Sequence, residues 1–243
     1  MRSVAVLLAS VFAVAGCGPP PPADRLAVFA AASLARVFTE LNSAAPAADS
    51  DTRIELTFAG TADLLAQLAA GARADVFATA DAATMEKAAA LGLVTTSVAF
   101  ATNTLTIAVA PGNPKQINGL RDLERVTVAA CAPQVPCGAA LARIDAATGV
   151  ELDPASEETS VTDVLNKVVT GQADAGLVYV TDARSAGDDV TAVPFPESVM
   201  APNTYRIAVT RDAADPARAA RFVDLVTGPA GRDVLRRAGF GEP

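Results

Sequence analysis

Two hydroxyl residues occupy equivalent positions in the sequence, each between a strand pattern and a helix pattern. Ser33 follows an apolar strand at 26–30 and two alanines. Thr61 follows a strand with alternating apolar residues from Ile54 and a break at Gly60. Each hydroxyl is therefore expected beside the first turn of a helix, where unpaired N–H groups and a partial positive charge suit an anion.

Either residue taken alone is explained as an ordinary helix N-cap, because Ser and Thr are favoured at that position. Two such units in succession, on adjacent strands of one sheet, would aim both hydroxyls at the same crevice. A shared anionic ligand therefore stands beside the capping interpretation.

Strand and helix patterns alternate along the rest of the chain. Residues 54–81 form a β-α-β unit, which normally implies a parallel sheet. Further helices are predicted at 34–41, 82–91, 120–123, 139–148, 161–170 and twice within 216–238, and further strands at 103–110, 126–130, 175–180 and 205–210. The strand break near residue 100 and the return near 205 indicate an α/β fold in which a second lobe is inserted into the first.

The two lobes are expected to enclose a cleft. Lobe 1 is predicted at 24–101 plus 206–243, and lobe 2 at 102–205. No internal repeat is visible in the sequence. The helices whose N-termini are expected to point into the cleft begin at Ser33, Thr61, Gly138 and Val161.

The N-terminus has the features of an exported lipoprotein. Residues 1–16 contain one basic residue, an apolar run and then small residues, which is the pattern of a signal peptide. This segment ends before Cys17 in a sequence that resembles the bacterial lipobox, and residues 17–23 form a Pro-rich tether, expected to be an extended spacer. A plain cleaved signal with an incidental cysteine is the alternative. We predict an extracytoplasmic protein anchored to the cell membrane through a lipid on Cys17.

Export has a consequence for the two remaining cysteines, Cys131 and Cys137. In an oxidising compartment a close pair of this kind indicates one disulfide that closes a short loop. A metal site is the alternative, but two thiols in a chain without His make a poor one. The disulfide is therefore the prediction, and no bare metal ion is expected.

The composition excludes several classes of function. The chain has no His, which removes the Ser-His-Asp and Cys-His arrangements of nucleophilic enzymes. The G-x-S-x-G, P-loop and G-x-G-x-x-G motifs are absent as well. A formal net charge of −8 without a basic cluster argues against nucleic acid as a partner. An acidic protein can still bind an anion, because helix termini act locally and distant charges are screened.

Taken together, these motifs resemble the molybdate-binding protein (ModA) family, the substrate-binding components of ABC importers. The resemblance covers residues 26–240. It is carried by five segments in the matching order and spacing: VFAAASL (28–34), FAGTADLLAQLAAGARADVFATAD (58–81), VPCGAAL (135–141), SVTDVL (160–165) and GLVYVTDA (176–183). It implies a two-lobed periplasmic-binding-protein fold of type II, in which each lobe has a mostly parallel sheet flanked by helices and the cleft holds a tetrahedral oxyanion.

The resemblance also implies a set of ligands. Ser33 would bind the oxyanion through its hydroxyl and its N–H, and Thr61 through its hydroxyl, at a position where the family usually has Ser. Cys137 and Val161 would each donate a backbone N–H, and Tyr179 would donate its hydroxyl. No cofactor is implied.

Two features of the helix after Gly60 bear on which oxyanion is selected. Thr61 carries a methyl group that Ser lacks, and this group would enter the pocket. Asp63 lies in the first turn of the same helix, where its charge favours the helix dipole but would oppose a bound dianion unless the side chain points away.

The resulting hypothesis is a monomeric solute-binding lipoprotein, not an enzyme, that captures molybdate or tungstate and delivers it to the permease of an ABC importer. One alternative is a binding protein of the same fold for sulfate, another small anion or an organic ligand. A secreted hydrolase with Ser33 as its nucleophile, and a purely structural lipoprotein, are alternatives of a different class.

Overall fold

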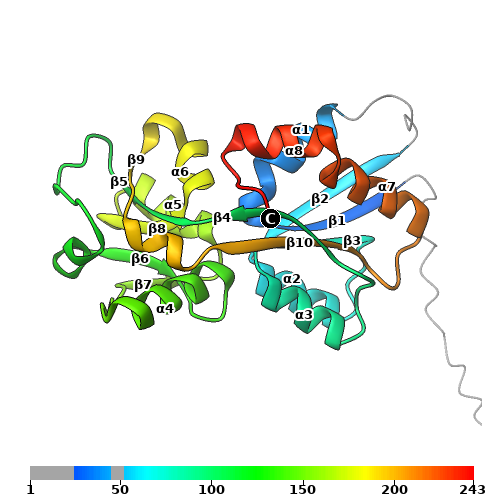
Figure 1. The fold of residues 1–243 in the computed structure, drawn as a ribbon, viewed down its shortest axis with the longest axis horizontal. Coiled ribbons are helices and arrows are strands. Elements are labelled where there is room, and N and C mark those ends of the chain that lie inside the picture. The colour runs from blue at the N-terminus through cyan, green and yellow to red at the C-terminus, as the bar shows by residue number, and fades with distance from the viewer. Residues whose placement is uncertain (1–24, 45–51) are drawn as a thin grey trace, which may run out of the picture.

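The computed structural model describes residues 25–44 and 52–243. The predicted signal peptide at 1–16, the tether at 17–23 and the lipidation site Cys17 lie outside these residues. Within them the chain forms two five-stranded sheets, each in its own lobe (Figure 1). No helix in the described part of the chain is long and apolar enough to cross a membrane.

The first sheet has the strand order β2-β1-β3-β10-β4. Strands β2, β1 and β3 are parallel to one another, and β10 runs antiparallel to both of its neighbours. All strands except β10 therefore point in the same direction. The bounds are β1 Arg25–Ala31, β2 Arg53–Ala59, β3 Val76–Thr79, β4 Val98–Asn103 and β10 Asn203–Val209.

The second sheet repeats this topology with the order β7-β6-β8-β5-β9. Strands β7, β6 and β8 are parallel, and β5 is the single reversed strand. The two lobes are thus built to one plan although the sequence shows no repeat. The bounds are β5 Leu105–Val109, β6 Val128–Cys131, β7 Ser156–Glu158, β8 Ala175–Tyr179 and β9 Thr191–Val193.

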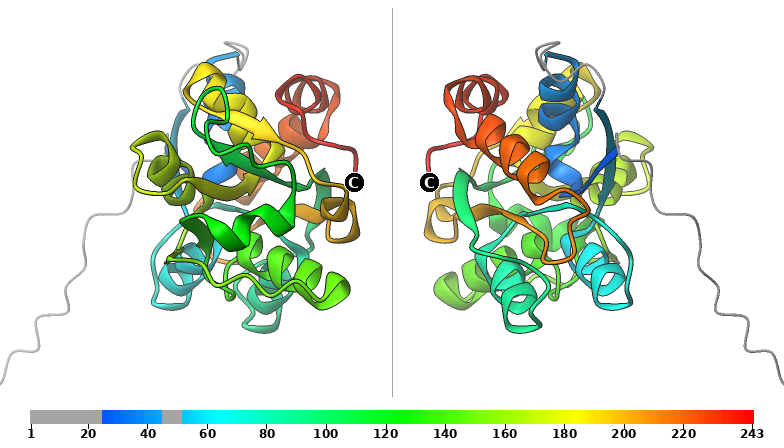
Figure 2. Two further views of the ribbon diagram at one scale, coloured as in Figure 1. Left: turned by 90° about the vertical axis from the view of Figure 1, so that its left-hand side faces the viewer. Right: turned by 90° about the vertical axis from the view of Figure 1, so that its right-hand side faces the viewer.

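Helices cover both faces of each sheet. In the first lobe, α1, α7 and α8 lie on one face and α2 and α3 on the other, as the end-on views show (Figure 2). In the second lobe, α5 and α6 lie opposite α4 (Figure 1). The bounds are η1 Ala32–Leu34, α1 Ala35–Ala44, α2 Thr61–Ala69, α3 Ala82–Ala90, η3 Leu120–Arg125, α4 Pro136–Thr148, α5 Val161–Val169, α6 Val180–Ala186, η4 Gly187–Asp189, η5 Pro196–Met200, α7 Pro216–Thr227 and α8 Pro229–Ala238.

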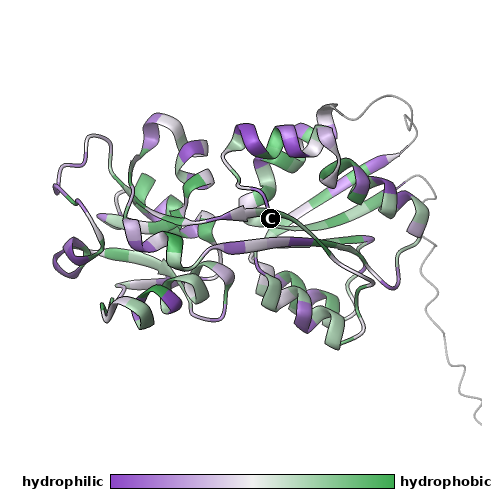
Figure 3. Ribbon diagram, in the orientation of Figure 1, coloured by the Kyte–Doolittle hydropathy of each residue, from purple (hydrophilic) through white to green (hydrophobic). Residues whose placement is uncertain are grey.

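The sequence of β1 explains why helices cover both faces of its sheet. Leu26, Val28 and Ala30 pack into the core cluster under α1, α7 and α8. Phe29 points the other way and packs with α2 and α3. A strand buried on both faces reads as a continuous apolar run rather than as an alternation, as expected for a parallel sheet between helices. Figure 3 shows the complementary pattern on an outer helix, α8, which carries hydrophilic residues next to hydrophobic ones.

Two connections join the lobes. Strand β4 is separated from β5 by Thr104 alone, and β9 leads through η5 into β10. The lobe-facing ends of β4 and β10 meet where Asn103 pairs with Asn203. The predicted two-lobed α/β fold with mostly parallel sheets is confirmed.

Several local elements differ from the predictions. Strands β4 and β9 were not predicted. Helix α4 begins at Pro136, ahead of the expected start at 139, because Pro is favoured in the first turn and the loop after β6 is correspondingly shorter. Residues 156–158 pair with β6 as β7, a strand that was not predicted. Helix α6 follows β8 directly and was not predicted.

Candidate anion-binding site

A small cavity lies between the two lobes and collects all five residues predicted as ligands. Its volume of about 20 Å³ admits the centre of a water-sized sphere and little more. The two lobes therefore approach each other closely here. The first lobe lines the cavity with Ala31, Ala32, Ser33, Gly60, Thr61 and Ala80, and the second with Val135, Pro136, Cys137, Thr159, Ser160, Val161 and Tyr179.

Helix N-termini from both lobes supply backbone N–H groups to this cavity. Helices α2 and α4 have Gly60 and Val135 as N-caps, and neither residue forms a side-chain capping bond. Cys137 and Val161 lie in the first turns of α4 and α5, where N–H groups have no partner within the helix. These N–H groups and the helix dipoles favour negative charge in the cavity.

Helix α5 can still offer a backbone N–H to the cavity, although its N-terminus is capped by a side chain. The hydroxyl of its N-cap, Ser160, accepts the N–H of Asp163 at 3.2 Å and donates to the Asp163 carboxylate at 2.7 Å. This capping interaction satisfies the third N–H of the helix. The N–H of Val161 is not consumed by it.

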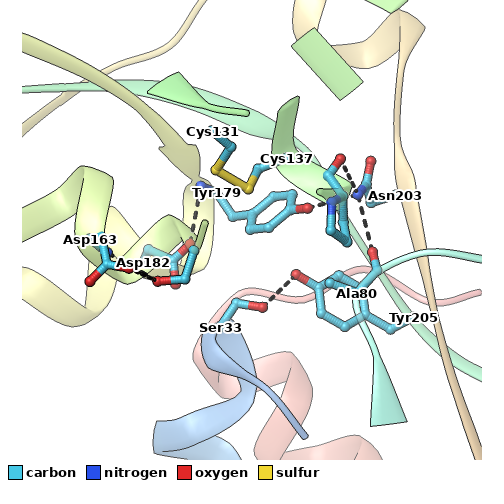
Figure 4. Close-up of a disulfide and its surroundings, with 11 residues drawn as sticks. Ser33, Ala80, Cys131, Cys137, Asp163, Tyr179, Asp182, Asn203 and Tyr205 are labelled. Carbon is cyan, nitrogen blue, oxygen red and sulfur yellow. Dashed lines mark hydrogen bonds between the residues drawn. A yellow bond between two sulfur atoms is a disulfide. The ribbon is translucent and has the colours of Figure 1, made fainter. Parts of the chain in front are cut away.

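The hydroxyl of Tyr179 is oriented by an amide from the strand that joins the lobes. Asn203 Nδ2 donates to Tyr179 Oη at 2.7 Å (Figure 4). The tyrosine oxygen therefore acts as an acceptor, which leaves its own hydrogen to be donated elsewhere. Tyr179 is buried and lines the cavity, so this hydrogen can be donated to a ligand there or to the neighbouring Tyr205 hydroxyl.

The other two hydroxyls can be oriented in the same way. Ser33 Oγ and Tyr205 Oη are 2.9 Å apart, and burial raises the pKa of Tyr205 far above its usual value. The phenol therefore stays protonated and can donate to Ser33, which frees the serine hydrogen. Thr61 Oγ1 accepts the N–H of Ala80 at 3.3 Å. With this arrangement all three hydroxyls use their oxygens within the protein and can turn their hydrogens toward the cavity.

Asn203 and Tyr205 are candidate functional residues that the sequence reasoning missed, because each hydrogen-bonds to a predicted ligand. Asn203 Nδ2 also donates to the carbonyls of Ala80 and Pro136, each at 3.1 Å, and thereby ties one lobe to the other. The strand–hydroxyl–helix patterns that indicated ligand-binding residues occur at the ends of parallel strands. Both residues instead come from β10, the reversed strand, and no local motif marks them.

The guanidinium group of Arg143 contacts the side-chain amide of Asn203 on the side away from Tyr179. Arg143 Nη2 donates to Asn203 Oδ1 at 2.9 Å. Burial raises the pKa of Tyr179 well above its usual value, the neighbouring Tyr205, Asp182 and Asp81 raise it further, and the guanidinium of Arg143 opposes the shift. Tyr179 is consequently a neutral donor over the whole physiological pH range.

Two acidic residues near the site behave differently. Asp63 is exposed and does not line the cavity, although its carboxylate lies beside Gly60, 3.3 Å from the position that a Cβ atom there would take. Asp182 is buried and accepts the N–H of Tyr179 at 3.1 Å. Burial raises the pKa of Asp182 to about 7, although that hydrogen bond lowers it in part.

The predicted disulfide between Cys131 and Cys137 is confirmed, with 5.6 Å between the two Cα atoms. It ties the end of β6 to the first turn of α4 (Figure 4). The thiol of Cys137 is therefore used for structure, and only its N–H can serve a ligand. Among the described residues, no group of three or more His, Cys, Asp or Glu could hold a metal ion.

Comparison with known proteins places the chain in a family. The sequence profile described as bacterial extracellular solute-binding protein matches residues 26–241. The chain is 50% identical over 229 residues to the molybdate-binding protein ModA of Mycobacterium tuberculosis H37Rv and to that of Mycobacterium bovis. These alignments cover 93% of this chain and 88% of each relative. The chain belongs to the molybdate-binding protein (ModA) family.

Solved structures agree with the fold. The periplasmic molybdate-binding protein of Azotobacter vinelandii superposes with a TM-score of 0.79 at 22% identity, over 90% of this chain and 99% of its own. The sulfate-binding protein SubI of Mycobacterium tuberculosis superposes with a TM-score of 0.72 at 20% identity, over 89% of this chain and 86% of its own. Members of this family are extracytoplasmic solute-binding transport proteins. This chain is therefore a solute-binding protein and not an enzyme.

Proposed function

We propose that this protein captures molybdate outside the cytoplasm and delivers it to the membrane permease of an ABC importer. The observation that supports this most directly is the set of hydrogen bonds around the cavity. Asn203, Tyr205 and the N–H of Ala80 can occupy the hydroxyl oxygens, so that only hydrogens face the ligand. The 50% identical relatives named molybdate-binding proteins support the same ligand.

A site that contains only hydrogen-bond donors favours anions that carry no proton over anions that do. Phosphate keeps a proton near neutral pH and would need an acceptor in the protein, and an unmatched buried polar group costs about 1–3 kcal/mol. Molybdate, tungstate and sulfate carry no such proton. The proposed ligands for molybdate are the hydroxyls of Ser33, Thr61 and Tyr179 and the N–H groups of Ser33, Cys137 and Val161.

Donor bonds of this kind are strong enough for tight binding. Each charge-assisted hydrogen bond contributes about 1.5–3 kcal/mol, and a micromolar complex needs about 8 kcal/mol in total. Six such bonds exceed that requirement. The surplus offsets the loss of hydration of the dianion and the cost of bringing the lobes together.

Cavity size decides among the unprotonated oxyanions. Sulfate is smaller than molybdate, so donors spaced for molybdate would reach it poorly, whereas tungstate is proposed as a second ligand. Thr61 is nearly fully buried in the cavity wall, and its methyl group is expected to narrow the site relative to Ser. Sulfate is the competing ligand to test, because a sulfate-binding protein shares this fold.

We further propose that the protein is a monomer held at the outer face of the membrane by a lipid on Cys17. The lobes proposed to move on binding are those predicted at 24–101 plus 206–243 and at 102–205, except that the ends of β4 and β10, 102–103 and 203–205, lie in the sheet of the first lobe. The closed pair would present the surface that the permease recognises. A Cys17→Ser variant, which is expected to appear in the soluble extracytoplasmic fraction, tests the anchor. Equal membrane retention of the two proteins would contradict it.

Thermal unfolding tests the ligand. The mature chain carrying Cys17→Ser is unfolded with molybdate, tungstate, sulfate or phosphate added separately. A ligand at 100 times its dissociation constant adds about 2.7 kcal/mol of stability, which corresponds to a few degrees for a chain of this size. We expect a shift with molybdate and tungstate only. A shift with sulfate would mean that Thr61 has narrowed the site, and no shift with any anion would refute the proposal.

A further inference from the structure

The local backbone conformation at position 60 does not require a glycine. Gly60 is the N-cap of α2, and its backbone angles, φ −55° and ψ 136°, belong to a region that every residue adopts. The usual argument for a glycine in a turn, a positive φ, does not apply to it. The requirement for a residue without a side chain must come from what surrounds it.

The atoms nearest to a Cβ at Gly60 belong to the other lobe, and the next nearest is Asp63 Oδ2 in its own helix, at 3.3 Å. A Cβ atom at Gly60 would lie 2.1 Å from the carbonyl oxygen of Thr159 and 3.2 Å from its carbonyl carbon. Gly60 follows β2 in the first sheet, whereas Thr159 lies between β7 and α5 in the second lobe. Ala62, in the first turn of α2, packs against the core of the second lobe. The two lobes thus touch backbone to backbone at this point.

The Thr159 carbonyl cannot easily move aside. The preceding residue is fixed because Glu158 O accepts the N–H of Ala132 at 2.9 Å. The following residue is fixed by the Ser160 capping bonds with Asp163. A side chain at Gly60 would therefore require the lobes to part by about 1 Å before its Cβ reached an ordinary contact distance.

We propose that Gly60 is a closure determinant: the absence of its side chain allows the lobes to approach closely enough for donors of both lobes to bind one anion. This inference rests on the proposed function. A separation of about 1 Å would stretch hydrogen bonds across the cleft beyond bonding distance. A larger residue at 60 would leave each half of the site intact and still prevent tight binding.

The test compares Gly60→Ala and Gly60→Ser with Gly119→Ala in the mature chain carrying Cys17→Ser. Gly119 is the matched control, because it too is an N-cap glycine in extended conformation, but nothing lies within 4 Å of its Cβ position. The serine variant provides a favoured N-cap residue, which separates a steric effect from a loss of capping. Molybdate affinity is measured by calorimetry, and closure by the radius of gyration in small-angle scattering with and without molybdate.

Both Gly60 variants are expected to bind molybdate at least about tenfold more weakly than the parent and to show no compaction at saturating molybdate. Gly119→Ala is expected to behave as the parent does. Parent-like affinity and compaction in the Gly60 variants would overturn the inference and leave the proposed function standing. Gly60 variants that fail to fold without ligand would also overturn it, because the contact would then be permanent. A parent that neither binds nor compacts would refute the proposed function together with the inference.

Discussion

The partners of the hydroxyl groups explain how uncharged residues can hold a dianion. A hydroxyl is both donor and acceptor, so by itself it does not discriminate against a protonated ligand. Asn203 removes this ambiguity at Tyr179 by donating to its oxygen. Its amide has two hydrogens for three acceptors, since Ala80 and Pro136 also lie at 3.1 Å. In the proposed site, the discrimination between oxyanions would therefore depend on a residue that does not line the cavity.

Replacing Asn203 by Leu tests this dependence. The change preserves size and removes the amide hydrogens, so the Tyr179 hydroxyl is expected to turn and donate to the nearby carbonyls of Ala80 or Pro136. Molybdate affinity should fall at least about tenfold, as it should for Tyr179→Phe. Calorimetry on the two single variants and the double variant measures both effects.

The double variant distinguishes positioning from general structure. If Asn203 acts through Tyr179, the double variant should bind about as weakly as either single variant. Losses that add up in full would show that Asn203 supports the site by another route, such as its contacts between the lobes.

At the scale of the elements, a disulfide in the connection from β6 to α4 holds the proposed N–H donor of Cys137 in place. Cys131 ends β6 and Cys137 lies in the first turn of α4, six residues later. Gly138 fits against the same turn, because a Cβ there would lie 2.1 Å from the carbonyl oxygen of Ala132. The tight turn and the disulfide together hold the N-terminus of α4 at the cavity.

Replacing both Cys131 and Cys137 by Ala should lower the free energy of unfolding by about 2 kcal/mol, because a short closed loop no longer restricts the unfolded chain. Urea denaturation measures this change. Molybdate binding should suffer less than in Tyr179→Phe, since an alanine at position 137 retains the backbone N–H.

Unchanged stability in the double alanine variant would contradict a stabilising role for the disulfide. A loss of binding as large as that in Tyr179→Phe would indicate that the cross-link, and not only the N–H, determines the geometry of α4.

At the scale of the whole molecule, one carboxyl group, that of Asp182, is buried close to the proposed anion site. Asp182 lies behind Tyr179, and burial raises its pKa from 3.8 to about 7. Asp145 on α4 is shifted in the same direction, to a pKa of about 6, by burial and by the charge of Glu151. Both groups hold their protons more strongly in the folded state than in the unfolded state.

These shifts predict how stability depends on pH. Between about pH 4 and pH 7 the folded state binds more protons than the unfolded state, so the free energy of unfolding should fall as the pH rises through this range. Asp182→Asn removes the larger contribution while an amide oxygen can still accept the Tyr179 N–H. Urea denaturation at several pH values should therefore give a flatter profile for the variant than for the parent. Parallel profiles would refute the assignment to Asp182.

The sequence by itself determined the elements and the positions that follow them. Apolar runs such as 26–30 and the hydroxyls after them, Ser33 and Thr61, predicted strands that end at an anion site, because strand ends and helix starts are local features. The short spacing of Cys131 and Cys137 predicted their disulfide for the same reason. The ligand set beyond the hydroxyls came from the resemblance to the family.

Only the tertiary structure decided which groups act on these residues from a distance. Asn203 is 24 residues from Tyr179 and 123 from Ala80 in the sequence, and Tyr205 is 172 from Ser33. Strand β7 at 156–158 was not predicted, and it forms by pairing with β6, a partner that lies 25 or more residues earlier in the sequence. Gly60 has an ordinary backbone conformation and reveals its role only through the Thr159 carbonyl of the other lobe. Hydrogen-bond direction and close approach depend on positions in space, and these were set when the two lobes packed together.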